Sequence, residues 1–216
     1  MGAVLIIAGG PLDAAFGMEY IAQGTWEYVI AVDAGLAFCQ HAGLVPDLIL
    51  GDFDSAQAQT VRYYRERMPE RFRQFPAHKD YTDTELALQE AYRIPCERIE
   101  ILGALGGRLD HTLGNLALLR QALDHGKCCR LADVKNRVHM ISRRTVLTRS
   151  ALYAGKLSLV PFGGPVTGLT LAGFAYEVTD LTLSAATTRG ISNEVTADTA
   201  VIDLKEGALL VVESRD

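Results

Sequence analysis

The sequence predicts an α/β protein, in which an N-terminal parallel-sheet α/β domain is followed by a smaller all-β sandwich or barrel domain. Within the first 133 residues, short apolar runs alternate with helix-like segments, the pattern of a parallel sheet covered on both faces. From about Val138, strand-like runs are separated by Gly, Pro, Asn and Asp turns, which is typical of an antiparallel sandwich or barrel. We therefore expect domains at residues 1–137 and 138–216.

The elements of the first domain follow from runs of apolar and β-branched residues. The expected strands are Ala3–Ala8, Tyr28–Val32, Leu48–Leu50, a weak strand near Phe72–Phe75, Arg98–Leu102 and Cys128–Ala132. Between them, helices are expected near Asp13–Ala22, Gly35–Ala42, Gln57–Met68, Asp83–Tyr92 and His111–His125. Alternation of strands and helices predicts that the strands run parallel.

The second half contains strand-like runs and no convincing helix. These runs are Thr145–Thr148, Lys156–Val160, Val166–Leu171, Glu177–Ser184, Ala200–Leu204 and Leu209–Glu213. The polar and basic segment from Asn136 to Arg144 is interpreted as the crossover between the two domains.

Composition narrows the possible partners and the compartment. The chain has 216 residues, of which 49% are hydrophobic, enough for one large core or two modest ones. The formal net charge of -5 gives no basic surface for nucleic acid. No run of 18 apolar residues is present, so we expect no membrane span, and the apolar start lacks the positive region of a signal peptide. Four cysteines without CxxC spacing suggest reduced thiols in the cytoplasm.

Acidic residues follow the ends of several expected strands. Asp33 follows the second strand, Asp52 and Asp54 follow the third, and Asp83 and Asp110 follow later ones. Ligands of open parallel sheets bind at this edge, so a site is expected there. Each acid also has a structural reading: Thr82 and Glu85 form a capping box, Asp83 suits the first turn of a helix, and Asp110 and Asp33 could be cap and turn residues.

Asp52 and Asp54 are the hardest to explain structurally. Two carboxylates two residues apart repel each other, and a cation between them removes the repulsion. Mg²⁺ is the natural choice, because it binds one or two carboxylates together with phosphate oxygens. Phosphates would be held by glycine-loop N–H groups, by Lys79 and by Arg108. Neither GxxxxGK[ST] nor GxGxxG occurs, so neither a P-loop nor a dinucleotide site is expected.

Several short segments, in this order and spacing, resemble the thiamine pyrophosphokinase family over nearly the whole chain. They are Asp33–Gly35, Pro46–Asp47, Gly51–Ser55, Lys79–Asp83 with Glu85, Gly106–His111 with Asn115, and Gly190–Glu194. The resemblance implies transfer of a diphosphate from ATP to thiamine, giving thiamine diphosphate and AMP. It also implies a homodimer with active sites shared between subunits, in which residues 1–137 bind ATP and 138–216 bind thiamine.

The resemblance also implies roles for individual residues. Catalysis is assigned to Asp52, Asp54, Asp83 and Asp110, and Mg²⁺ to Asp52, Asp54 and Asp83. ATP and its phosphates are assigned to Gly9, Asp33, Gly35, Lys79, Asp80, Thr82, Gly106, Gly107 and Arg108. Ser192 and Asn193 would contact thiamine. His78 stands where the family often has an acid. The only tryptophan, Trp26, lies in the first domain, so the aromatic partner of thiamine would be Phe174 or Tyr176.

The expected chemistry is in-line attack of the thiamine hydroxyl on the β-phosphorus of ATP, with AMP leaving. Positioning and charge neutralisation dominate such transfers, and either Asp83 or Asp110 would accept the hydroxyl proton. Carboxylates would also attract cationic thiamine. Two alternatives remain: a haloacid-dehalogenase-like phosphatase with Asp52 as nucleophile, and a nucleotide-binding module without catalysis.

Overall fold

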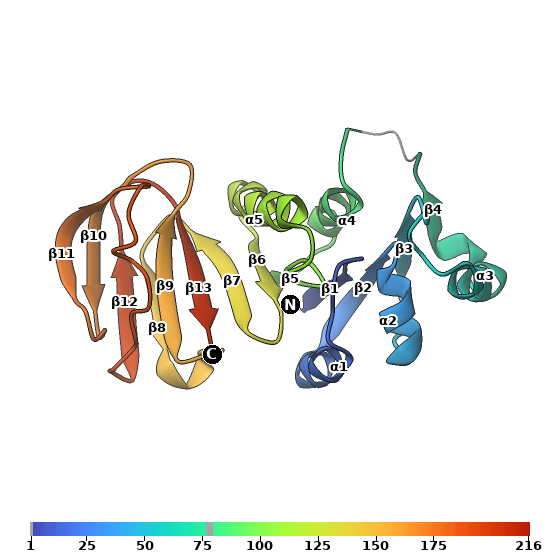
Figure 1. Ribbon diagram of the computed structural model, residues 1–216, viewed down its shortest axis with the longest axis horizontal. Helices are drawn as coiled ribbons and strands as arrows, with labels where there is room; N and C mark the ends of the chain where they lie inside the picture. Colours follow the sequence, from blue (N-terminus) through green and yellow to red (C-terminus); the bar gives the residue numbers. More distant parts are fainter. Residues whose placement is uncertain (1, 77–79) are drawn as a thin grey trace. The chain divides into compact units, whose positions relative to one another are not determined.

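A computed structural model of the protein describes residues 2–76 and 80–216 and divides into two compact units (Figure 1). The first unit spans Met1–Val134 and the second Lys135–Asp216. The predicted fold class, a parallel-sheet α/β unit followed by an all-β unit, is confirmed. No helix in the described part of the chain is long and apolar enough to cross a membrane.

The first unit is built on a parallel sheet with the strand order β4-β3-β2-β1-β5-β6. Its strands are β1 (Ala3–Ile7), β2 (Trp26–Val32), β3 (Leu48–Gly51), β4 (Phe72–Gln74), β5 (Arg98–Leu102) and β6 (Cys128–Ala132). All five residues of β1 are buried, because helices cover both faces of this central strand. The continuous apolar run of the sequence is therefore the mark of a strand inside a parallel sheet.

The helices lie on both sides of this sheet, with α4 and α5 on one side and α1 and α2 on the other (Figure 1). They are α1 (Ala14–Gln23), α2 (Gly35–His41), α3 (Ala58–Arg67), the 3-10 turn η1 (Pro69–Arg71), α4 (Asp83–Tyr92) and α5 (Leu109–Asp124). The α4 start follows the predicted cap, since Thr82 Oγ1 accepts a hydrogen bond from the Glu85 backbone N–H at 3.2 Å. The α5 helix begins two residues before the expected His111.

The second unit is a sandwich of two antiparallel sheets, which decides between the sandwich and the barrel of the prediction. One sheet contains β7 (Asn136–Ile141), β13 (Leu209–Ser214) and β9 (Lys156–Pro161), with β13 between the other two. The other has the order β11-β10-β12-β8, formed by β11 (Val178–Leu183), β10 (Val166–Ala172), β12 (Thr199–Asp203) and β8 (Thr145–Thr148). Apolar side chains from both sheets form one core, and η2 (Arg149–Ala151) is a short 3-10 turn.

The interpretation of Asn136–Arg144 as a crossover was wrong, because most of this segment is the strand β7. The polar and basic residues of this segment had suggested a connection rather than a strand. Arg137 lies opposite Glu213 in the β7–β13 register and donates two hydrogen bonds to that carboxylate, at 3.0 and 2.8 Å. A buried Glu213 thus neutralises a basic residue that would otherwise be out of place in a sheet.

Candidate active site

A pocket of about 480 Å³ lies where the connection order of the parallel sheet reverses. The chain places β2, β3 and β4 on one side of β1 and then crosses to β5 on the other side, and such a switch point is where open α/β sheets bind ligands. Of the residues predicted for the site, those that line this pocket are Gly9, Asp33, Asp52, Thr82, Asp83, Gly106 and Arg108. The structure therefore brings these seven predicted residues together at one pocket.

Three carboxylates converge at this edge of the sheet. Asp33, Asp52 and Asp54 each offer an oxygen atom, and these oxygens lie within 4.8 Å of one another. Within the described residues, this is the group of acidic, histidine and cysteine side chains whose spacing would suit a metal ion. Asp83, which was assigned to the metal, lines the same pocket but is not in this group, whereas Asp33, which was assigned to ATP, is in it.

Asp33 is held in an unusual environment immediately after β2. Its backbone has a φ of 48°, in the left-handed region, and its Oδ2 accepts a hydrogen bond from the Ser55 hydroxyl. Its Oδ1 is buried and has no hydrogen-bond partner among residues 2–76 and 80–216. Burial raises the pKa of this carboxyl; Ser55 opposes the shift, and the charge of Asp52 adds to it. A buried oxygen of this kind is suited to a cation.

The loop after β3 is shaped by its own carboxylate. Oδ1 of Asp52 accepts a hydrogen bond from the backbone N–H of Asp54 at 3.0 Å, a local turn that aspartate favours. Phe53 between them has a φ of 63°, which is uncommon for a bulky side chain. The hydrogen bond between Asp52 and Asp54 and the left-handed backbone of Phe53 therefore define the conformation of this loop.

Two glycines at this edge of the sheet, Gly10 and Gly35, are required by close backbone packing. A Cβ atom at Gly10 would lie 2.4 Å from the carbonyl oxygen of Gly103, so the ends of β1 and β5 approach too closely for a side chain. Gly35 was predicted to bind ATP, yet a Cβ there would lie 2.3 Å from the carbonyl oxygen of Ile7. Gly35 is buried and does not line the pocket, so packing explains it without a ligand.

Arg108 and Asp110 form a bidentate ion pair. The guanidinium donates from Nε to Oδ1 at 3.1 Å and from Nη2 to Oδ2 at 2.6 Å. These bonds, with a third from the His111 backbone N–H at 2.9 Å, lower the pKa of Asp110 to about 2. While this ion pair is intact, the carboxylate of Asp110 is a poor proton acceptor. Asp110 also does not cap α5, because the cap position belongs to Arg108.

Other predicted residues lie elsewhere or outside the described part of the chain. Asp80 is exposed and Gly107 has a left-handed φ of 67°; neither lines the pocket. His78 and Lys79 lie outside the described residues. The pocket also contains residues that were not assigned to the site, namely Gly10, Pro11, Val32, Ser55, Tyr81, Thr84, Gly103, Ala104, His111 and Asn115. For Ser55, the available signal was a hydroxyl directly after the Asp52–Asp54 pair.

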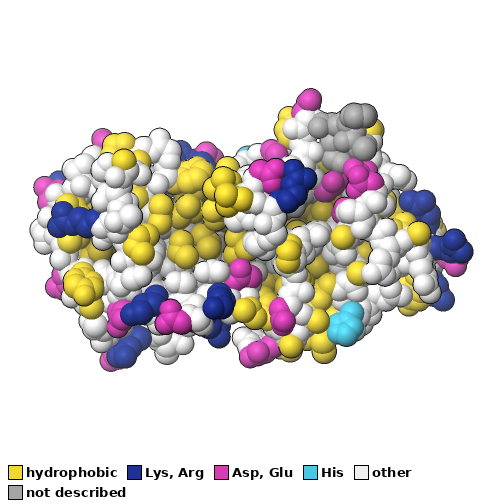
Figure 2. Space-filling view, viewed as in Figure 1, with side chains coloured by type: hydrophobic (Ala, Val, Ile, Leu, Met, Phe, Trp, Pro, Cys, Tyr) yellow, Lys and Arg dark blue, Asp and Glu magenta, His cyan; other side chains and the backbone are white. Residues whose placement is uncertain are grey.

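The sandwich unit has its own pocket, of about 430 Å³. Leucines of β9, β10 and β11 line it, and Tyr176, Arg189 and Asn193 contribute polar groups. Figure 2 shows a group of hydrophobic side chains on the visible face of this unit. Phe174 is buried in the sandwich core, so it cannot stack on a ligand there, whereas Tyr176 is 72% exposed.

Asn193 uses its side-chain amide inside the protein. Its Oδ1 accepts from the backbone N–H of Tyr176 at 3.0 Å, and its Nδ2 donates to the carbonyl oxygen of Tyr176 at 2.9 Å. Oδ1 also accepts from the backbone N–H of Glu194 at 2.9 Å. The buried amide therefore fixes the backbone of Tyr176 at the pocket, whereas Ser192 beside it is exposed.

Two family models match the chain. One is described as Thiamin pyrophosphokinase, catalytic domain, and matches residues 23–131; the other, Thiamin pyrophosphokinase, vitamin B1 binding domain, matches residues 142–209. The curated thiamine pyrophosphokinase of Bacillus subtilis (strain 168) is 32% identical over 218 residues, covering 100% of each chain.

Solved structures agree with this result. The crystal structure of thiamine pyrophosphokinase from Bacillus subtilis superposes with a TM-score of 0.88 at 30% identity, covering 99% of each chain. That of thiamin pyrophosphokinase from Geobacillus thermodenitrificans gives a TM-score of 0.84 at 29% identity, over 99% of this chain and 98% of the other. The similarity thus extends over both units.

Proposed function

The chain belongs to the thiamine pyrophosphokinase family, and we propose that it transfers a diphosphate from ATP to thiamine at the acidic pocket of its first unit. The observation that carries this placement is the convergence of Asp33, Asp52 and Asp54 at the switch point of the sheet. Neither alternative, a haloacid-dehalogenase-like phosphatase or a non-catalytic module, is supported by the similar proteins. The reaction yields thiamine diphosphate and AMP.

A divalent metal ion fits this group of carboxylates, and we assign it as Mg²⁺. All three donors are carboxylate oxygens, which Mg²⁺ prefers, and the buried Oδ1 of Asp33 lacks a hydrogen-bond donor within the described residues. Asp33, Asp52 and Asp54 would hold the ion. When bound, Mg²⁺ neutralises phosphate charge and orients the phosphate groups for displacement.

The protein's own groups surround the place where the phosphates would lie. Thr82 and Arg108 line the pocket, and so do the backbones of Gly9 and Gly106, which offer N–H groups to phosphate oxygens. Release of Arg108 from its pair with Asp110 would let the guanidinium bind the incoming triphosphate. Asp83, in the first turn of α4, lines the pocket and Asp110 does not, so Asp83 is the proposed acceptor for the thiamine hydroxyl proton.

Thiamine is assigned to the sandwich unit, at the pocket that Tyr176 and Asn193 line. Ser192 is exposed beside it and retains its proposed role as a direct contact, while Asn193 acts by fixing Tyr176. We further propose a homodimer whose active sites combine the acids of one subunit with the sandwich unit of the other, acting in the cytoplasm. Four free cysteines suit the reducing environment of that compartment.

The direct test is incubation of the protein with Mg²⁺, ATP and thiamine, followed by separation of the nucleotides. We expect AMP and thiamine diphosphate in equal amounts. A matched control replaces thiamine with an analogue that lacks the terminal hydroxyl, which should abolish AMP formation. ADP as the main product, or AMP formation with the analogue, would contradict diphosphate transfer to that hydroxyl.

A further inference from the structure

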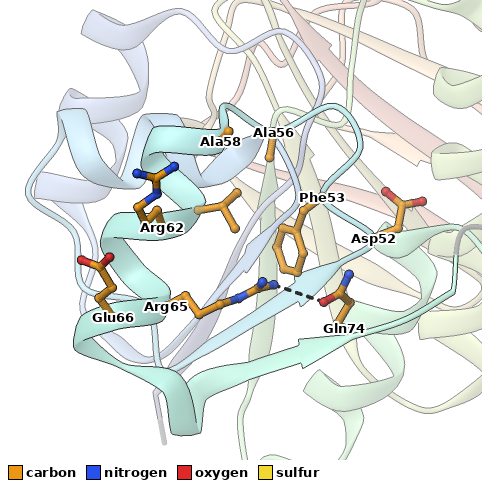
Figure 3. A pocket seen from close by; sticks show the side chains of 9 residues that line it. Asp52, Phe53, Ala56, Ala58, Arg62, Arg65, Glu66 and Gln74 are labelled. Atoms are coloured by element: carbon orange, nitrogen blue, oxygen red, sulfur yellow. Dashed lines mark hydrogen bonds between the residues drawn. The ribbon is translucent and has the colours of Figure 1, made fainter.

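A second cavity of the first unit, of about 730 Å³, opens on the other side of Asp52 (Figure 3). It lies between the loop after β3, helix α3 and strand β4, which contribute Phe53, Arg65 and Gln74 respectively. Asp52 lines both this cavity and the acidic pocket, so the two spaces meet at one proposed metal ligand. A single elongated ligand held at Asp52 could therefore occupy both.

Part of the wall of this cavity is apolar. Phe53 presents its ring, and Ala56, Ala58 and Val61 add small apolar surfaces. Figure 3 shows the Phe53 ring directed toward Arg65, while the carboxylate of Asp52 lies apart from that ring. The backbone of Phe53 is left-handed. Although Phe53 lies between Asp52 and Asp54 in sequence, it lines this cavity and not the acidic pocket.

The planar guanidinium of Arg65 is held in place by two aromatic rings and a hydrogen bond. Its guanidinium carbon lies 6.0 Å from the ring centre of Phe53 and 5.3 Å from that of Phe72. Its Nη2 donates a hydrogen bond to Oε1 of Gln74 at 3.1 Å, drawn as the dashed line in Figure 3. This bond orients the Gln74 amide, whose NH₂ group is a donor suited to a ring nitrogen of a heterocycle.

The charges of the cavity favour a neutral planar group over an anion. Among its lining residues, the positive charges of Arg62 and Arg65 are balanced by the negative charges of Asp52 and Glu66. An anion gains little from such a balanced wall, whereas an aromatic ring gains from stacking on Phe53 and on a guanidinium. The acidic pocket, in contrast, offers carboxylates for a metal and glycine N–H groups for phosphate.

We propose that this cavity binds the purine base of the nucleotide whose phosphates lie at the acidic pocket. The inference rests on the proposed function, because it uses the same nucleotide and the same Asp52. Phe53 and Arg65 stack on the base, and Gln74 donates to its edge. These three side chains are binding residues for the nucleoside and take no part in the transfer of the diphosphate.

The test compares binding of ATP and of inorganic triphosphate, each with Mg²⁺, by titration calorimetry of the full chain. Triphosphate carries the same phosphate groups without a base. We expect Arg65→Ala to weaken ATP binding about tenfold, the scale of losing one stacking partner, and to leave triphosphate binding unchanged. Arg65→Lys, which keeps the charge without the planar group, should behave in the same way.

Arg67→Ala is the matched control. Arg67 belongs to the same helix and lies 4.1 Å from the ring centre of Tyr63, outside the cavity, so its loss should change neither affinity. Equal weakening of ATP and triphosphate by Arg65→Ala, or an unchanged ATP affinity, would overturn the proposal.

A further variant separates this inference from the proposed function. Asp54→Asn should weaken both ligands, because it removes a proposed metal ligand that does not line the base cavity. If Asp54→Asn leaves both affinities unchanged, the phosphate assignment fails. A selective effect of Arg65→Ala on ATP would in that case still support the base cavity.

Discussion

The hydroxyl of Ser55 donates a hydrogen bond to Oδ2 of Asp33, which joins the loop after β3 to the end of β2. The two residues are 22 positions apart in sequence, and neighbouring strands bring them together. Oδ1 of the same carboxylate is buried and lacks a hydrogen-bond partner within the described ranges. The hydrogen bond from Ser55 therefore stabilises one oxygen of the Asp33 carboxylate. A bound cation would stabilise the other.

The first prediction concerns the pH dependence of stability without metal. The pKa of Asp33 is raised in the folded protein, so the folded state binds its proton more tightly than the unfolded state. Stability should accordingly fall as pH rises from the ordinary value of 3.8 through the raised pKa. Asp33→Asn should remove this part of the slope. Urea unfolding with a chelator across that range would measure it, and identical slopes for both proteins would contradict it.

The second prediction concerns Asp54→Asn. We expect turnover to fall by at least about a hundredfold, since even residues that only support a metal ligand cost 10- to 100-fold. Without metal, loss of one of three crowded carboxylates should leave the fold intact and raise the melting temperature. Steady-state kinetics and thermal unfolding, with and without Mg²⁺, give the two readings. Near-normal activity at ordinary Mg²⁺ would refute the metal role, and an unfolded variant would make Asp54 structural.

The third prediction distinguishes a positioning role of Asn193 from a direct contact with thiamine. Asn193→Ala leaves the backbone N–H and carbonyl of Tyr176 without their side-chain partner, which should cost about 1–3 kcal/mol of stability and raise KM for thiamine. Asn193→Asp brings a buried carboxylate oxygen against the Tyr176 carbonyl oxygen, so its loss of stability near neutral pH should be at least as large.

Ser192→Ala is the control for this comparison, because Ser192 is exposed and its backbone N–H, which donates to Ser158 Oγ at 2.9 Å, is kept. It should raise KM for thiamine without loss of stability. A full loss of activity in Asn193→Ala at unchanged stability in urea would instead make Asn193 a direct contact.

Local patterns account for most of the fold. The strand Arg98–Leu102 and the helix Asp83–Tyr92 have the predicted bounds, because each is an apolar run or a capped helix that its own residues define. The strand Asn136–Ile141 was missed because the charge of Arg137 is neutralised by Glu213, 76 positions away. Such long-range pairing has no local signature.

The site was predictable at the level of the sheet edge but not of individual contacts. Strand ends identified Asp33, Asp52 and Asp83 as neighbours, and all three line one pocket. Which acids approach one another depends on the left-handed backbone of Asp33 and on the hydrogen bond from Ser55, neither of which periodicity reveals. The amide of Asn193 was likewise assigned to a ligand, although the protein itself uses it.

The last prediction tests the proposed sharing of active sites in a two-fold dimer. Asp83 lies in the first unit and Asn193 in the second, and in the proposed dimer each site takes these residues from different subunits. Asp83→Asn is expected to be nearly inactive alone, and Asn193→Ala to be nearly inactive when thiamine is far below its raised KM. Assayed at such a thiamine concentration, the two variants should restore activity when co-expressed. Random pairing makes half of the dimers mixed, and each mixed dimer rebuilds one intact site of two, so activity should return to about a quarter of wild type. A site built within one subunit would leave a lesion in every site, and no activity would return. A fully active monomer at the assay concentration would also refute the shared site.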